Sequence, residues 1–222
     1  MWKSLSMKSN KPEVRNVIII GYGGNCIDIQ ETLEDINISP SPVKYKFVGF
    51  LDDNPNSPAL GPLASWRKYK DCYFVNGIGS TKTYKTKEAI LESLGIPKER
   101  YLTIVHPTAY ISKSASIGLG SVIFQNVVIT SNAHIGNQVM ILPNSVVSHD
   151  SRIGDYSILA GCVCISGQVN IENNCYVGSN TSIKDGITVG AGALIGCGTN
   201  VVKDVDPDSI NIGNPSYRME KQ

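Results

Sequence analysis

One histidine and its neighbour have the residue types expected of a proton-transfer site. His149 is followed directly by Asp150, in the segment Val-Ser-His-Asp-Ser-Arg. A histidine with a pKa near neutrality can take a proton from an amine or a hydroxyl, and a nearby carboxylate can orient its ring. His149 is therefore a candidate general base. An exposed histidine at a turn, with no part in chemistry, is the alternative interpretation.

The remaining histidines and the cysteines do not have the spacing of a metal centre. We expect His106, in a His-Pro pair, at a hinge and His134 on the surface. Cys162 and Cys164 are separated by one residue, but no second Cys or His pair accompanies them. We predict no metal site, because zinc sites in proteins are usually completed by two such pairs.

A glycine turn and an acidic pair form a second candidate site. The apolar run Asn16–Ile20 leads into Gly21-Tyr-Gly-Gly, which provides Gly21, Gly23 and Gly24, with Asn25 next. About thirty residues further on, an apolar segment ends in Asp52 and Asp53, and a third ends near Gly79. A glycine turn with a carboxylate after the next strand is typical of nucleotide-binding sheets. A plain turn before Pro55 is the alternative for the two aspartates.

The elements that position these residues follow from a period of six. Stepping by six from Ile111 to Val201 gives sixteen positions, all of them isoleucine, valine or leucine, and a mostly small residue stands four positions after each. Such hexads predict a triangular prism with three short strands per coil and the aliphatic side chains inside.

The period also predicts which residues stack on one another. Residues eighteen apart lie one coil above another, so His149 should lie between Ser131 and Gly167. A glycine beside a candidate base leaves room for a thioester and exposes a backbone N–H for an oxyanion.

The N-terminal half has a different pattern. Apolar runs at 16–20, 46–51 and 72–76 predict strands, and the spacing in 27–36 and 81–95 predicts helices. The fold class expected is an α/β Rossmann-like domain followed by an all-β parallel β-helix. The predicted boundaries are an extension at 1–15, a Rossmann-like domain at 16–105, a β-helix domain at 106–206 and a tail at 207–222.

Composition limits the partners. The chain has 20 basic and 19 acidic side chains with no basic run, which argues against nucleic acid as a partner. No segment is as apolar as a membrane span or an export signal requires, so we expect a cytoplasmic protein with six reduced cysteines.

From about residue 16 onward, the chain resembles a known family. The motifs that carry the resemblance are the glycine turn, Gly-Phe-Leu-Asp-Asp, His-Pro, the unbroken hexads with His-Asp, and the final Gly213-Asn214-Pro215. The family is the hexapeptide-repeat sugar acyltransferase family, of the sialic-acid O-acetyltransferase and bacillosamine or perosamine N-acetyltransferase type. The resemblance implies a left-handed prism and a homotrimer, with acetyl-CoA between adjacent prisms and a nucleotide-linked sugar held by the N-terminal domain.

The resemblance also implies a role for each candidate residue. His149 would be the general base, Asp150 its acidic partner and Gly167 the oxyanion donor, while Asp52 and Asp53 would contact the nucleotide. The sequence departs from the family in having Asn25 where a histidine is common and Ile158 where a second histidine is common. We expect an acetyl-CoA-dependent N-acetyltransferase. The alternatives are an O-acetyltransferase acting on a sugar or sialic acid hydroxyl and a non-catalytic trimeric binding protein.

Overall fold

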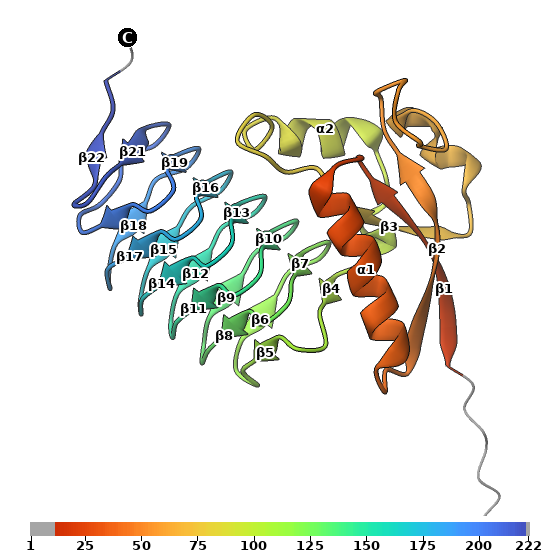
Figure 1. Cartoon of the computed structure of the whole chain (residues 1–222), viewed down its shortest axis with the longest axis horizontal. Helices are drawn as coiled ribbons and strands as arrows, with labels where there is room; N and C mark the ends of the chain where they lie inside the picture. Colours follow the sequence, from red (N-terminus) through yellow and green to blue (C-terminus); the bar gives the residue numbers. More distant parts are fainter. Residues whose placement is uncertain (1–11, 221–222) are drawn as a thin grey trace, which may run out of the picture.

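The structure is a computed structural model that describes residues 12–220 (Figure 1). Most of the predicted extension at 1–15 therefore lies outside the described residues. The chain begins with a small α/β unit and continues as a long stack of short strands. The fold class predicted from the sequence is confirmed.

A three-stranded parallel sheet forms the first unit. Its strand order is β2-β1-β3, with β1 at Glu13–Ile20, β2 at Val43–Leu51 and β3 at Cys72–Asn76. The last four residues of β1 are buried because apolar clusters lie on both faces of the sheet. Helix α1, Gly24–Ile38, packs on one face through Ile29 and Leu33.

Helix α2, Lys87–Leu94, and two short 3₁₀ turns, η1 at Leu63–Lys68 and η2 at Lys98–Arg100, complete this unit. The helix predicted at 81–95 is shorter than expected. It begins only at Lys87, because turns precede it in which the Thr83 N–H donates to the Ser80 carbonyl and the Thr86 N–H to the Thr83 carbonyl.

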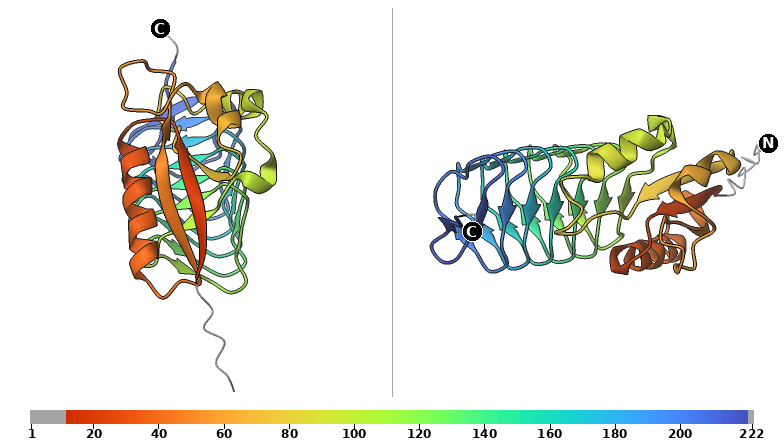
Figure 2. Two further views of the ribbon diagram at one scale, coloured as in Figure 1. Left: turned by 90° about the vertical axis from the view of Figure 1, so that its right-hand side faces the viewer. Right: turned by 90° about the horizontal axis from the view of Figure 1, so that it is seen from above.

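The stack consists of three parallel sheets, one for each side of a prism (Figures 1 and 2). The first side contains β4 (Ile104–Val105), β7 (Val122–Ile123), β10 (Met140–Ile141), β13 (Ile158–Leu159), β16 (Tyr176–Val177), β19 (Leu194–Ile195), β21 (Ile210–Ile212) and the antiparallel β22 (Tyr217–Arg218). The second contains β5 (Tyr110–Ile111), β8 (Val128–Ile129), β11 (Val146–Val147), β14 (Cys164–Ile165), β17 (Ser182–Ile183) and β20 (Asn200–Val201). The third contains β6 (Ser116–Ile117), β9 (His134–Ile135), β12 (Arg152–Ile153), β15 (Asn170–Ile171) and β18 (Thr188–Val189).

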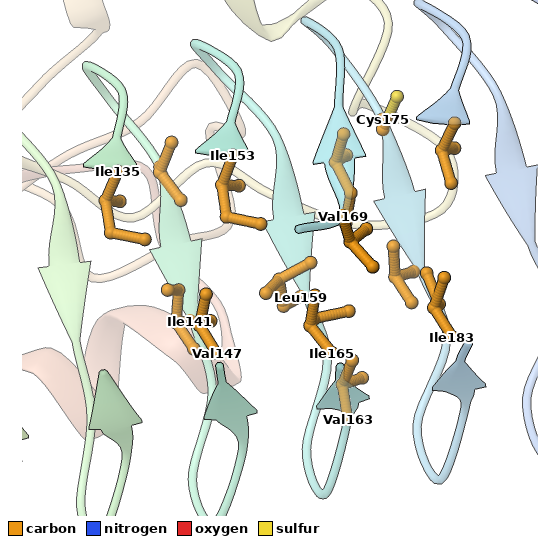
Figure 3. Packing of buried hydrophobic residues seen from close by; sticks show 14 of the residues in the cluster. Ile135, Ile141, Val147, Ile153, Leu159, Val163, Ile165, Val169, Cys175 and Ile183 are labelled. Atoms are coloured by element: carbon orange, nitrogen blue, oxygen red, sulfur yellow. The ribbon is translucent and has the colours of Figure 1, made fainter. Parts of the chain in front are cut away.

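The register confirms the predicted three hexads per coil. Val146 of β11 pairs with Val128 on one side and Cys164 on the other, a step of 18 residues each way. The aliphatic residue of each hexad points into the prism, where Ile141, Val147, Ile153 and Leu159 pack on one another (Figure 3).

Small residues and left-handed backbone make the corners possible. The buried Ser151 hydroxyl donates to the Ser166 carbonyl and accepts the Val169 N–H, so it satisfies two backbone groups of the next coil. Corner residues such as Asn132, Asp150 and Asn174 have φ near +60°, a region that Asn and Asp adopt more readily than most residues.

The first unit is attached to the first side of the prism. Its buried residues Val17 and Ile29 share an apolar cluster with Met140 and Ile158 of that side. Further along, the Asn174 amide donates to Glu88 of α2 at 2.6 Å. His106, expected at a hinge, is buried, and its Nε2 lies 2.8 Å from Asp35 Oδ2 of α1. It therefore ties α1 to the start of the prism.

Among residues 12–220, no helix is long and apolar enough to cross a bilayer.

Candidate functional site

His149 and Asp150 lie at the corner of the prism between β11 and β12. His149 Nδ1 is 2.8 Å from Asp150 Oδ2, and both side chains are about half exposed. The hydrogen bond from His149, and then a second from the Asn132 amide at 3.0 Å, hold the pKa of the Asp150 carboxyl below its usual value. Since an ionised carboxylate can only accept, Nδ1 carries the proton of this hydrogen bond, and in the neutral ring Nε2 is then the acceptor.

Gly167 lies directly against this imidazole, as the stacking of coils predicts. A Cβ added at Gly167 would lie 2.6 Å from His149 Cε1 and Nε2, so only glycine leaves the ring its position. Backbone bonds from Asp150 N to the Ser131 carbonyl and from Gln168 N to the His149 carbonyl place His149 between Ser131 and Gly167. Within the described chain, the Gly167 N–H donates to no acceptor.

A separate hollow of about 440 Å³ lies at the carboxyl ends of β1, β2 and β3. Gly21, Gly23, Gly24, Asn25, Asp52 and Gly79 all line it, so six of the seven residues predicted to bind substrate come together. Parallel strands end at one edge of a sheet, which is why residues so distant in sequence meet there. Asn25 joins two of the three loops, since its amide donates to the Gly79 carbonyl at 2.9 Å.

The two aspartates differ in position. Asp52 lines the hollow, and its carboxylate also accepts the Tyr22 N–H at 2.9 Å and the Asn54 N–H at 2.8 Å. Asp53 does not line the hollow. Its Oδ1 accepts the Leu63 N–H at 2.9 Å and so fixes the start of η1.

Other residues of the hollow were not selected from the sequence. Tyr22, Cys26, Gly77, Ile78, Ser80 and Thr83 also line it. Burial raises the pKa of the Cys26 thiol to about 12, so the thiol keeps its proton. The position of Ser80 and Thr83 just after β3 was the available signal, because every strand of this sheet ends at the same edge.

The hollow and His149 lie on different sides of the prism. A Cβ added at Gly79 would be 2.9 Å from Ile158 Cδ1, which places the hollow against β13 on the first side. His149 lies at the corner where the second and third sides meet, opposite the first. Ile158 therefore packs beside the hollow and away from His149 of the same chain. This is the position at which the sequence departs from a common histidine of the family that it resembles.

Within residues 12–220, no group of three or more His, Cys, Asp or Glu side chains is positioned to hold a metal ion.

Comparison with known sequences finds matches to part of the chain. The family described as GMPPB C-terminal domain matches residues 102–189. A putative acetyltransferase of Staphylococcus aureus is 40% identical over 56 residues, which are 25% of this chain and 28% of that protein. A chloramphenicol acetyltransferase of Agrobacterium fabrum is 44% identical over 57 residues, 26% of this chain and 27% of the other. The matches thus span about a quarter of these relatives.

Comparison with solved structures covers nearly the whole chain. PerB of Caulobacter crescentus, solved with CoA and GDP-perosamine, has a TM-score of 0.80 at 23% identity, over 92% of this chain and 97% of PerB. The acetyltransferase domain of PglB from Neisseria gonorrhoeae has a TM-score of 0.79 at 24% identity, over 92% of this chain and 100% of that one. Both parts of the fold, in this order, are therefore shared with these proteins.

Proposed function

We propose that the chain transfers an acetyl group from acetyl-CoA to an amino sugar linked to a nucleotide, because it shares its fold with PerB and with the acetyltransferase domain of PglB, and part of it is similar to a putative acetyltransferase. The observation that carries the proposal is the His149–Asp150 hydrogen bond with Gly167 against the ring. It provides an oriented base and an unoccupied backbone N–H at one exposed corner.

The transfer is direct. The sugar amine attacks the carbonyl carbon of the thioester, and a C–N bond forms as the C–S bond breaks. His149 Nε2 takes the proton that the nitrogen loses, Asp150 stabilises the imidazolium, and the imidazolium returns this proton to the CoA sulfur as the thiolate leaves. The Gly167 N–H donates to the oxyanion that develops on the carbonyl oxygen.

The residues of the hollow are suited to bind the nucleotide part of the acceptor substrate. It lies at the N-terminus of α1, where the N–H groups of Gly24 and Asn25 donate to no acceptor within the described chain and can attract phosphate. Asp52 retains lone pairs for a ribose or base, and glycines at 21, 23 and 24 let a ligand approach the backbone. PerB, which shares this fold, was solved with GDP-perosamine.

The proposed function includes a homotrimer in which each site is formed by two chains. In one chain the hollow and His149 are separated by the prism, so a sugar bound in the hollow is acetylated by His149 of an adjacent chain. Acetyl-CoA then lies between neighbouring prisms, along the corner that carries His149 and Gly167.

The test is mass spectrometry of UDP-, dTDP- and GDP-linked amino sugars incubated with acetyl-CoA. We expect one acetyl group to be added to one of these sugars, and His149→Ala to lower kcat about 10²- to 10⁴-fold. His134→Ala is the matched control, because His134 is an exposed histidine of β9 bonded through Nδ1 to Ser116. A His149→Ala enzyme as active as the control would refute the assignment of the base.

The same panel separates the alternatives. Acetylation of a sugar lacking the amine would support O-acetyl transfer. CoA binding without any product would support a non-catalytic binding protein.

A further inference from the structure

The Asp150 carboxylate is held by hydrogen bonds at both of its oxygens. Oδ2 lies 2.8 Å from His149 Nδ1, and Oδ1 accepts from the side-chain amide of Asn132 at 3.0 Å. Asn132 stands 18 residues before Asp150, so it lies at the same corner of the prism, one coil earlier. The acidic partner of the proposed base therefore has a partner of its own.

A single hydrogen bond between exposed neighbours does little to fix the orientation of a carboxylate. The side chains of His149 and Asp150 are 56% and 45% exposed, and the last side-chain torsion of an aspartate has a broad range. A donor from the preceding coil at the second oxygen restricts this torsion, because both oxygens must then point at fixed donors. It also favours the ionised carboxyl, and so contributes to the lowered pKa of Asp150 after the larger effect of His149.

Asn132 is itself fixed by the coil before it. Its backbone N–H donates to the Ser114 hydroxyl at 3.0 Å, again over 18 residues. Its φ of 56° lies in the left-handed region, which asparagine adopts more readily than most residues. Ser114, Asn132 and Asp150 thus form a column along one corner that ends at the proposed base.

A similar contact occurs at another corner, where no histidine is present. The Asn126 amide donates to Asn144 Oδ1 at 3.3 Å over 18 residues, and Asn126 also has a φ of 56°. Such a contact alone is therefore a feature of the corners of this prism. What distinguishes Asn132 is that the side chain it holds also contacts His149. Asn126 provides a matched control for this reason.

Few charged groups face the Asp150 carboxylate. On its own coil and the two adjacent coils, the corner positions besides His149 and Asp150 are uncharged, namely Ser131, Asn132, Gly167 and Gln168. Lys113 and Asp185 stand two coils away on either side of His149, about 10 Å at the usual spacing of paired strands, where water and salt screen them. Arg152 of β12 is exposed, and within residues 12–220 it forms no ion pair with Asp150.

We propose that Asn132 is a positioning residue for the acetyl transfer, whose amide holds the Asp150 carboxylate in the orientation that fixes the ring of His149. The inference rests on the proposed function, because it concerns the same base. Asn132 contacts Asp150 rather than His149, so its effect passes through Asp150.

The first measurement is an NMR titration of the Asp150 carboxyl in the full chain, with carbon-13 in the aspartates and Asp150→Asn to identify the signal. It needs no substrate, so its result does not depend on acetyl transfer. In Asn132→Gly, which tolerates a positive φ, we expect the pKa of Asp150 to rise because the charged form loses a donor. Asn132→Asp should raise this pKa further, because a second carboxylate then stands beside the first. Asn126→Gly should leave it unchanged.

The second measurement is the rate of acetyl transfer to the sugar that wild type accepts. We expect Asn132→Gly to lower kcat about three- to tenfold with the KM for acetyl-CoA unchanged, while Asn126→Gly keeps the kcat of wild type. In an Asp150→Gly background, Asn132→Gly should cause no further loss, because a residue that acts only through Asp150 has nothing left to hold.

An Asp150 pKa that is the same in Asn132→Gly and wild type would overturn the proposal. So would a shifted pKa with kcat unchanged, or an equal loss of kcat from Asn132→Gly with and without the Asp150 side chain. If wild type acetylates no sugar although the pKa shifts as expected, the proposed function is refuted, and the catalytic role of Asn132 with it, while the contact itself is confirmed.

Discussion

The contribution of the Asp150 charge to catalysis can be tested with one conservative substitution. Asp150 has φ 60°, which asparagine also adopts, so Asp150→Asn keeps the backbone but removes the carboxylate. The imidazolium formed during transfer then loses its counter-charge, and Nδ1 loses its strongest acceptor. We expect kcat to fall about tenfold or more with the KM for acetyl-CoA unchanged, measured from initial rates. Equal kcat values for Asp150→Asn and wild type would assign Asp150 to the turn alone.

Lys87 is a residue whose burial lowers stability. Its side chain is fully buried at the start of α2, Nζ has no partner in the described structure, and burial lowers its pKa to about 7. Between pH 7 and the ordinary lysine pKa near 10.5, the unfolded chain holds this proton and the folded chain does not. Stability from this group therefore rises as pH rises through that range.

Lys87→Met should consequently raise the free energy of unfolding at pH 7 by roughly a few kcal/mol, because a methionine has no charge to desolvate. It should also flatten the dependence of stability on pH between 7 and 10. Urea unfolding at several pH values measures both effects, with the exposed Lys82→Met as control. A destabilised Lys87→Met protein, or an unchanged slope, would mean that Lys87 has a partner in solution.

At the scale of elements, the prism could be predicted because its signal repeats. Each hexad places one aliphatic residue such as Ile141 or Ile153 inside, so the period determines side-chain direction and coil length together. The stacking of Gly167 on His149 follows from the same arithmetic. Strand starts were less predictable: β1 begins at Glu13 and β2 at Val43, three residues before each apolar run, because their first residues pair while still partly exposed.

The position of the hollow relative to His149 could not be predicted from the sequence. It depends on which side of the prism receives the first unit, and that is decided by contacts between distant residues such as Gly79 and Ile158.

A substitution at Gly167 tests whether the orientation of the His149 ring depends on the absence of a side chain at position 167. In Gly167→Ala the new methyl group would overlap the imidazole, so the ring must turn away from Asp150. We expect at least a tenfold loss of kcat with the fold retained by circular dichroism. Gly161→Ala is a matched control, since its Cβ would meet only the Pro143 carbonyl oxygen at 3.6 Å. Equal activity of the two variants would contradict the packing argument.

At the scale of the whole molecule, the first side of the prism is already covered by the first unit over β7, β10 and β13. The corner with His149 is open and faces away from it. In the homotrimer that we propose, a closed ring would bring the corner of each chain to the hollow of the next, and closure would give every site the same pair of surfaces. Activity should therefore require two chains for each site.

Mixing two inactive variants tests this requirement. His149→Ala removes the base, and Gly24→Phe obstructs the hollow, where an added Cβ meets nothing within 4 Å and the ring can extend. If each site takes its base from one chain and its hollow from the neighbour, an equal mixture unfolded and reassembled together should regain about a quarter of wild-type activity, because each component is intact in half of the chains. The rate of acetyl transfer measures the recovery. Each variant refolded alone should stay inactive, and a mixture that also stays inactive would place base and hollow of a site in the same chain.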